Sequence, residues 1–416
     1  METPKPQTVL FDRKMKRNLF LLVCCQAVGQ SANTMMFIAT ALSVVTFISD
    51  HGLATLPVTM QHLGVMLWVF PAALLMQRVG RRLGYQVGSL FGIVGATVCG
   101  LGLYLRLFPL MCLGGVILGY SVACLQMYRF GAVELVPVSY RAKAISWVTA
   151  GGVVAGIIGP TVAHAAYDIV MPLYLGTYAS MVVVHVVVLI IMSFIRFPPM
   201  SAPEIGATGI EAVRIPPRPL WQIAAQPRFA AAVIAAMVAY GTMSFLMSAS
   251  PLAIVGCGLP QGEAHWVIFL HVMGMFVPSF YTGNLISRFG ILNVMAAGSV
   301  TLLLGVLISL HGMEAWNFRV ALTLNGVGWN FLFVGATALV TTCYAPSERA
   351  KAQALNDFLI FGTTATSSFL AGFLQDRLGW YPLNQASIVL ITISFFAVFW
   401  LWLQQRRPAA MKLAGE

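Results

Sequence analysis

Residues 173–195 read LYLGTYASMVVVHVVVLIIMSFI and contain no Asp, Glu, Lys or Arg. About 20 apolar residues allow a helix to cross about 30 Å of hydrocarbon, so this stretch is long enough to span a membrane. Similar runs recur along the whole chain, separated by short polar breaks. Segments that alternate apolar and polar residues over the length of a strand do not occur, which disfavours a transmembrane barrel. We therefore expect an all-α membrane protein.

The runs predict twelve transmembrane helices. Charged residues make up only 9% of the chain, against about 25% in soluble domains, so a surface that faces water throughout is excluded. The first apolar run follows a basic segment but is too long for a signal sequence, so we expect it to be the first span. The predicted spans are 19–47, 57–77, 84–105, 109–131, 143–166, 173–195, 229–250, 263–286, 291–311, 318–342, 352–374 and 385–404.

Basic residues are concentrated on one side of the predicted membrane. The formal net charge is +11, and of the 24 Lys and Arg residues all but Arg106, Arg319 and Arg377 fall on loops and ends that lie together in a twelve-span order. The positive-inside rule assigns that side, with both termini, to the cytoplasm. Topology thus explains the basic composition, and we expect the lipid bilayer, not nucleic acid, as the partner of this chain.

Two short stretches occur twice. RAKA stands at 141–144 and again at 349–352, and ALLMQRVG at 73–80 resembles GNLISRFG at 283–290. Both repeats fall on predicted cytoplasmic loops, after the second and the fourth helix of each half. The sequence therefore predicts two pseudo-symmetric six-helix bundles joined by a proline-rich cytoplasmic linker. The predicted parts are 1–195, the linker 196–228, and 229–416.

The stretch ALLMQRVGRR at 73–82 resembles a loop motif of the major facilitator superfamily, G-x-L-x-D-R-x-G-R-R. Ala73 stands in place of the first glycine and Gln77 in place of the acidic residue. The glycines between 152 and 159, with Pro160, resemble the glycine–proline motif in the fifth helix of that superfamily. The resemblance implies the major facilitator fold, in which two halves rock around a central substrate site.

Charged residues are scarce within the predicted spans. Arg129, Glu134 and Asp357 come close to the inner ends of their spans, and none lies near the midplane. This argues against sugar phosphates, carboxylates and polycations as substrates, because each needs a buried countercharge. We expect Arg78 and Arg81 to hold an inner gate shut, with Asp357 as the partner of one of them.

Sulfur and imidazole groups are more frequent in the predicted spans. Met243 and Met247 lie one turn apart in the seventh span, and His271 and Met275 lie one turn apart in the eighth. Each pair shares a helix face, and counting from the connecting loop puts the two pairs at similar depth. Thioether and imidazole ligands suit Cu(I), whereas calcium, magnesium and manganese prefer carboxylates. From the spacing alone, ordinary helix packing remains the favoured explanation.

The position of these two pairs resembles the CcoA-type copper importers, as does the run WVIFLHVMGMFVPSFYTGNLISRFG at 266–290. The resemblance implies a monomeric copper importer of a bacterial inner membrane. Copper, favoured as Cu(I), would be the transported substrate, destined for assembly of cbb3-type cytochrome c oxidase. No resident cofactor is expected.

The alternative function is transport, in either direction, of a neutral apolar organic compound. No phosphate loop, G-x-S-x-G or H-E-x-x-H motif occurs, so we do not expect an enzyme. In the tenth span, Asn325, Trp329 and Asn330 are expected to face the cavity or to bond another helix, because unpaired polar groups are costly in lipid.

Overall fold

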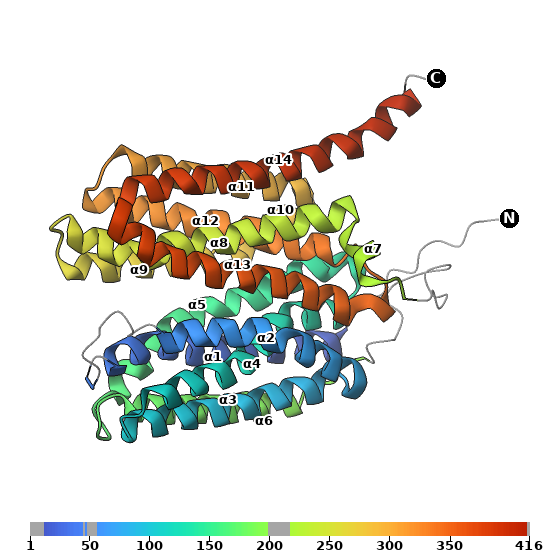
Figure 1. Ribbon diagram of the computed structural model, residues 1–416. Helices are drawn as coiled ribbons and strands as arrows, with labels where there is room; N and C mark the ends of the chain where they lie inside the picture. Colours follow the sequence, from blue (N-terminus) through green and yellow to red (C-terminus); the bar gives the residue numbers. More distant parts are fainter. Residues whose placement is uncertain (1–11, 45, 48–55, 199–216, 414–416) are drawn as a thin grey trace. The chain divides into compact units, whose positions relative to one another are not determined.

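The computed structural model describes residues 12–44, 46–47, 56–198 and 217–413, which are mostly helical and contain no strand (Figure 1). The predicted all-α fold is thus confirmed. Helices α1 to α7 are Arg13–Val44, Leu56–Val79, Arg81–Tyr104, Phe108–Glu134, Arg141–Ala166, Leu175–Ser193 and Leu220–Ala224. Helices α8 to α14 are Pro227–Gly256, Gln261–Phe276, Ser279–Phe289, Ile291–His311, Ala315–Val340, Arg349–Leu378 and Trp380–Leu413. Two 3₁₀ turns, η2 (Val138–Tyr140) and η4 (Pro346–Glu348), precede α5 and α13.

Within the described ranges, 11 helical segments are long and apolar enough to cross a membrane. Helix α13 covers the predicted span 352–374 but is not one of them, because Thr, Ser and charged residues lower its hydropathy. The predicted span 263–286 is divided into α9 and α10 at Pro278. A proline lacks the backbone N–H and clashes with the preceding turn, which explains the break.

The helices form two compact units. Unit 1 comprises Met1–Leu220 together with Tyr344–Phe358, and unit 2 comprises Trp221–Cys343 together with Leu359–Glu416. The first turns of α13 thus pack with unit 1, which the sequence did not predict. Part of the predicted linker, 199–216, lies outside the described residues, and α7 forms within its remainder.

The repeated sequences have the same structure in both halves. Gly80 precedes α3 with φ 88°, and Gly290 precedes α11 with φ 86°. Glycine adopts this left-handed region without the steric cost that a Cβ would add. The two RAKA stretches both begin a long helix directly after a 3₁₀ turn, at Arg141 and at Arg349.

Each unit also contains a close helix crossing built from two glycines. In unit 1, a Cβ added at Gly119 of α4 would lie 2.5 Å from the carbonyl carbon of Gly64 in α2. In unit 2, a Cβ at Gly326 of α12 would lie 2.4 Å from the backbone oxygen of His271 in α9. It would also lie 3.0 Å from the carbonyl carbon of Gly274. The second crossing brings α9 and α12 together where the candidate site forms.

Candidate functional site

His271 lies at the crossing of α9 and α12 and is fully buried. Its Nδ1 is 2.8 Å from the backbone oxygen of Leu322. A carbonyl oxygen only accepts, so Nδ1 donates and the neutral ring keeps Nε2 as an acceptor. Nε2 has no hydrogen-bond partner. The imidazole therefore presents one free acceptor inside unit 2.

Helix α12 carries further buried polar groups without partners, among them those of Asn325 and Trp329. Both amide atoms of Asn325 and the indole Nε1 of Trp329 form no hydrogen bond, although these residues are only 1% and 2% exposed. Asn325 and Trp329 are one turn apart and share a helix face. Leaving such a group unpaired costs about 1–3 kcal/mol, and native structures leave few of them. The three residues His271, Asn325 and Trp329 form what we call the open polar set.

The neighbouring amide of Asn330 shows the contrast. Its Nδ2 donates to the backbone oxygen of Met275 at 2.6 Å and to the hydroxyl of Ser279, and its Oδ1 accepts from Thr282 at 2.6 Å. Asn330 therefore fastens α12 to α9 and α10. The expectation that these amides bond another helix is met by Asn330, whereas Asn325 keeps its hydrogen-bonding capacity free.

Aromatic rings lie directly beside the open polar set. The Trp329 ring stacks on Phe333 with centroids 5.0 Å apart, and Tyr240 of α8 meets both rings edge-on at 5.2 and 4.9 Å. Phe276 of α9 approaches Trp329 at 5.9 Å, and Phe361 of α13 approaches Tyr240 at 5.5 Å. Four helices thus contribute to one aromatic cluster, formed by these five residues. Aromatic rings of this kind can also pack against a flat ligand.

The predicted metal-ligating residues are distributed around this region. His271 and Met275 are buried on α9, whereas Met243 and Met247 are partly buried on α8. Counting from Tyr240, the two α8 methionines lie one and two turns further along the same face. Among the described residues, no group of three or more His, Cys, Asp or Glu side chains is arranged to hold a metal ion.

The predicted partner of Asp357 is wrong. Asp357 is fully buried near the start of α13, and its Oδ1 forms an ion pair with Arg129 of α4, not with Arg78 or Arg81. Asn356 also donates to this oxygen at 2.8 Å, while Oδ2 has no partner. The sequence identified Arg129 as a charge near the inner end of its span, and its low exposure explains why it needs a buried countercharge.

Arg81 has its own set of partners. Its Nη2 donates to Glu134 of α4 and to Gln353 of α13, at 2.7 Å in each case. Arg349 also approaches Glu134, at 3.8 Å. Arg81 is 1% exposed, so both contacts are shielded from water. These bonds attach the first turns of α13 to α3 and α4 within unit 1.

A third ion pair anchors the end of the predicted linker. Arg218 binds both carboxylate oxygens of Glu348 in η4, with Nε and Nη2 at 2.8 and 2.7 Å, and its backbone N–H donates at 2.8 Å. The backbone N–H of Ala345 donates to the same carboxylate at 2.8 Å. Burial by itself would raise the pKa of Glu348, but these bonds outweigh it and lower the pKa to about 2.

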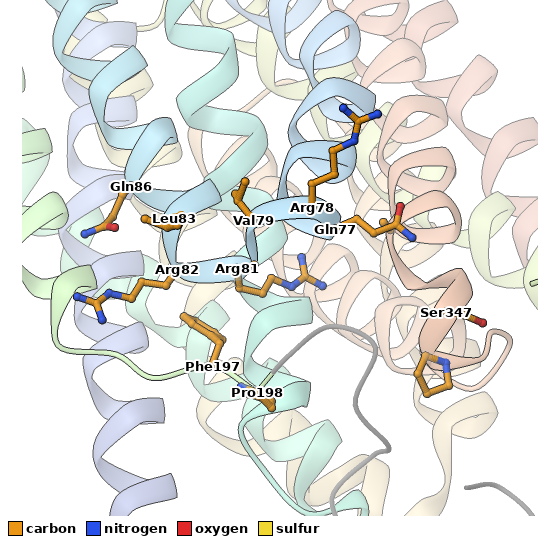
Figure 2. A pocket seen from close by; sticks show the side chains of 13 residues that line it. Gln77, Arg78, Val79, Arg81, Arg82, Leu83, Gln86, Phe197, Pro198 and Ser347 are labelled. Atoms are coloured by element: carbon orange, nitrogen blue, oxygen red, sulfur yellow. The ribbon is translucent and has the colours of Figure 1, made fainter. Parts of the chain in front are cut away.

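The remaining predicted gating residue, Arg78, lies in an open cleft of about 680 Å³ (Figure 2). The cleft is bordered by the loop between α2 and α3, by Phe197 and Pro198, and by η4. Arg78 is exposed and forms no ion pair with the described residues. Its gating role therefore stays a prediction.

The comparisons with known proteins agree on the type of protein. The Major Facilitator Superfamily profile matches residues 232–416. The "Riboflavin transporter RfnT" of Brucella anthropi is 38% identical over 89% of this chain and 92% of its own length. A Bacillus subtilis protein described as "Uncharacterized MFS-type transporter YddS" is 25% identical over 96% of this chain and 93% of its own length.

Solved structures show the same fold. One match is FucP, the fucose:proton symporter of E. coli, in its outward conformation. The TM-score is 0.74 at 18% identity, and the match covers 93% of this chain and 99% of the FucP chain. A bacterial homologue of the iron transporter ferroportin has a TM-score of 0.73 at 13% identity, over 92% and 98%. Because a sugar carrier and a metal-transporter homologue both match, the fold leaves the substrate open.

The relative from Brucella anthropi corrects the predicted function. It is similar to this chain over nearly the whole length of both, and it is a riboflavin transporter. The expectation of copper import is therefore wrong, and the resemblance to CcoA-type importers receives no support. Ordinary helix packing also produces Met and His residues one turn apart. It was already the favoured explanation of this spacing when the resemblance was left aside.

Proposed function

Because this chain belongs to the major facilitator superfamily, we propose that it is a secondary transporter of riboflavin. It is a multi-pass membrane transport protein and not an enzyme. The identity with the riboflavin transporter of Brucella anthropi supports this substrate. We further propose a bacterial inner membrane with both termini in the cytoplasm, in agreement with the distribution of basic residues.

The observation that carries the proposal is the open polar set beside the aromatic cluster in unit 2. Riboflavin has a flat tricyclic ring system with one polar edge, where an imide N–H stands between two carbonyl oxygens. The amide of Asn325 has one donor and one acceptor free, which complements that edge. The indole N–H of Trp329 can donate to a second carbonyl, and the rings of the aromatic cluster can stack on the flavin.

The neighbouring residues suit the rest of the molecule. Riboflavin is uncharged at neutral pH, and the open polar set and the aromatic cluster contain no Asp, Glu, Lys or Arg. The thioethers of Met243 and Met247 can pack against aromatic rings, which gives these residues a role without copper. Helix α13 carries hydroxyl groups at 363, 364 and 366–368 that can meet the hydroxyls of the ribityl chain. Riboflavin thus belongs to the uncharged organic compounds of the alternative prediction, although it is more polar.

The buried ion pairs of unit 1 would couple binding to gating. Asp357 and Arg129 hold α13 against α4, and Arg81 adds a second contact to α13 through Gln353. Protonation of Asp357 at its unpartnered Oδ2 would remove the charge that binds Arg129. We propose that these contacts close one gate, and that a proton opens it during alternating access.

Counterflow in proteoliposomes tests the function without assuming a direction. Vesicles that contain the purified protein are loaded with unlabelled riboflavin, diluted into labelled riboflavin, and compared with empty vesicles. We expect transient accumulation of label only with protein, and inhibition by flavins that retain the ring and its imide edge. A phosphorylated flavin should compete poorly, because the site has no countercharge. Equal accumulation in empty vesicles would exclude riboflavin as a substrate.

Two variants tie the transport to unit 2. Asn325→Ala removes both free amide atoms, and at about 1–1.5 kcal/mol for each hydrogen bond the apparent affinity should fall about 30- to 150-fold. The matched control is Asn293→Ala, because Asn293 is an exposed amide on α11 that binds only the backbone oxygen of Phe289. Equal affinities of the two variants would place the site elsewhere while leaving the transport activity itself intact.

A further inference from the structure

Three arginines from different segments of unit 1 line one cavity of about 530 Å³. Arg17 belongs to α1, Arg82 to the first turn of α3, and Arg196 follows the end of α6. Leu21 and Phe194 are part of the same lining, and no acidic side chain contributes to it. No residue of this lining belongs to the open polar set or to the ion pairs of the proposed gate.

Side-chain hydrogen bonds fix the three helix ends around this cavity. Asn18, next to Arg17, donates to the backbone oxygen of Arg196 at 3.0 Å and joins α1 to α6. Gln86, one turn after Arg82, donates to the hydroxyl of Ser193 at 2.8 Å and joins α3 to α6. These two interhelical hydrogen bonds therefore fix the backbone positions from which the three arginines extend.

The three guanidinium groups have no countercharge within the described residues. Each side chain is exposed and forms no hydrogen bond or ion pair there. Figure 2 shows Arg82 extending to the same side of α3 as Gln86, while Arg81 points to the opposite side, where it binds Glu134. The positive-inside rule explains how many basic residues this end carries, but not why three surround one cavity without an acid.

The surrounding apolar side chains indicate the depth of the cavity in the membrane. Phe20, Leu83 and Phe194 lie within three positions of the arginines in sequence and are 66%, 54% and 63% exposed. In a membrane protein, large exposed apolar side chains contact acyl chains. The arginines therefore lie where the apolar belt ends, at the level of the lipid headgroups.

We propose that this cavity binds the phosphate of an anionic phospholipid, with its acyl chains along Phe20 and Phe194. Arg17, Arg82 and Arg196 supply planar guanidinium groups, which suit bidentate phosphate binding. Basic pockets between transmembrane helices on the cytoplasmic side are a recurring way to bind such headgroups. The bound lipid would hold the ends of α1, α3 and α6 together. The proposal does not depend on the transported substrate.

The test measures lipid bound to the purified full-length protein by native mass spectrometry. Phosphatidylglycerol and phosphatidylethanolamine are titrated separately. We expect phosphatidylglycerol to bind at least tenfold more tightly. Each single variant, Arg17→Gln, Arg82→Gln or Arg196→Gln, should weaken it about fivefold, as one basic contact is worth about 1 kcal/mol near a membrane. The charge-matched controls replace Lys14, Arg288 or Lys351 singly with Gln, and each should bind like the parent protein.

Two outcomes would overturn the proposal. The first is equal binding of the two lipids, which would mean that the anionic headgroup is not selected, or equal weakening by the controls, which would mean that only the net charge of the protein matters. The other is displacement of phosphatidylglycerol by low millimolar inorganic phosphate, which would assign the cavity to a soluble anion. The single variants each remove one exposed side chain and leave Asn18 and Gln86 in place. Their melting temperatures without lipid should match that of the parent protein, and a loss of binding is then attributable to the cavity.

Discussion

Replacing Gly326 with alanine should separate α9 from α12. The added Cβ would lie 2.4 Å from the backbone oxygen of His271 and 2.8 Å from the backbone nitrogen of Met275. Neither atom can rotate away, so the helices must move apart by several tenths of an ångström or more. Overpacking of this kind costs about 1–3 kcal/mol, from which about 1 kcal/mol is regained because alanine favours a helix.

The matched control is Gly335→Ala, nine positions further along the same helix. A Cβ at Gly335 would lie 2.5 Å from Cγ of Met295, which belongs to a flexible side chain. Methionine has several low-energy conformations and adapts to such a change. The control should therefore keep the stability of the parent protein, or exceed it slightly through helix propensity.

Thermal unfolding in detergent and riboflavin counterflow measure the two consequences. With about 2–4 °C for each kcal/mol, Gly326→Ala should lower the melting temperature by a few degrees. Because the crossing holds His271 against Leu322, three residues before Asn325 on α12, transport should also fall at least about tenfold. If both alanine variants unfolded and transported alike, the crossing would not position the site, and the reasoning would be refuted.

Three further predictions concern single contacts. Asp357→Asn should abolish proton-driven riboflavin accumulation but leave counterflow measurable, since it removes the charge that binds Arg129; unchanged accumulation would contradict the proposed coupling. Trp329→Phe keeps the stacked ring and loses the N–H, so the apparent KM should rise about 3- to 10-fold; an unchanged KM would exclude the indole as a donor. The carboxylate of Glu348 has a pKa lowered to about 2 by its bonds, chiefly to Arg218. Its stabilisation should therefore be complete above about pH 4.5 and disappear as the pH falls toward 2, which melting curves of Glu348→Gln against the parent protein check.

The sequence was sufficient to predict the fold because its signals are local. Apolar runs of about 20 residues predict membrane helices one at a time. The repeated RAKA and the two loop glycines at 80 and 290 predicted two similar halves, and both repeats have matching structures. The break at Pro278 and the docking of the start of α13 on unit 1 were missed, since the first depends on one residue and the second on tertiary contacts.

The site was only partly predictable from the sequence. Asn325 and Trp329 were identified as polar groups that are costly when unpaired in lipid, and His271 was identified as a predicted copper ligand. All three keep unpartnered atoms. The ligand was assigned wrongly, because an i,i+4 pair of Met or His residues reports a shared helix face and not a coordination sphere. The partner of Asp357 was also predicted wrongly. It is Arg129, 228 positions away in the chain, and spacing along the sequence does not specify a contact between two helices that are so far apart in it.

The most direct test of the account is riboflavin binding to the purified protein, followed by the quenching of flavin fluorescence. Stacking on Trp329 and its neighbours should quench the flavin on binding, and saturation gives the affinity. We expect the parent protein and Asn293→Ala to bind with the same affinity, and Asn325→Ala to bind about 30- to 150-fold more weakly. Absence of saturable quenching by the parent protein, or equal affinity of all three proteins, would contradict a flavin site on α12.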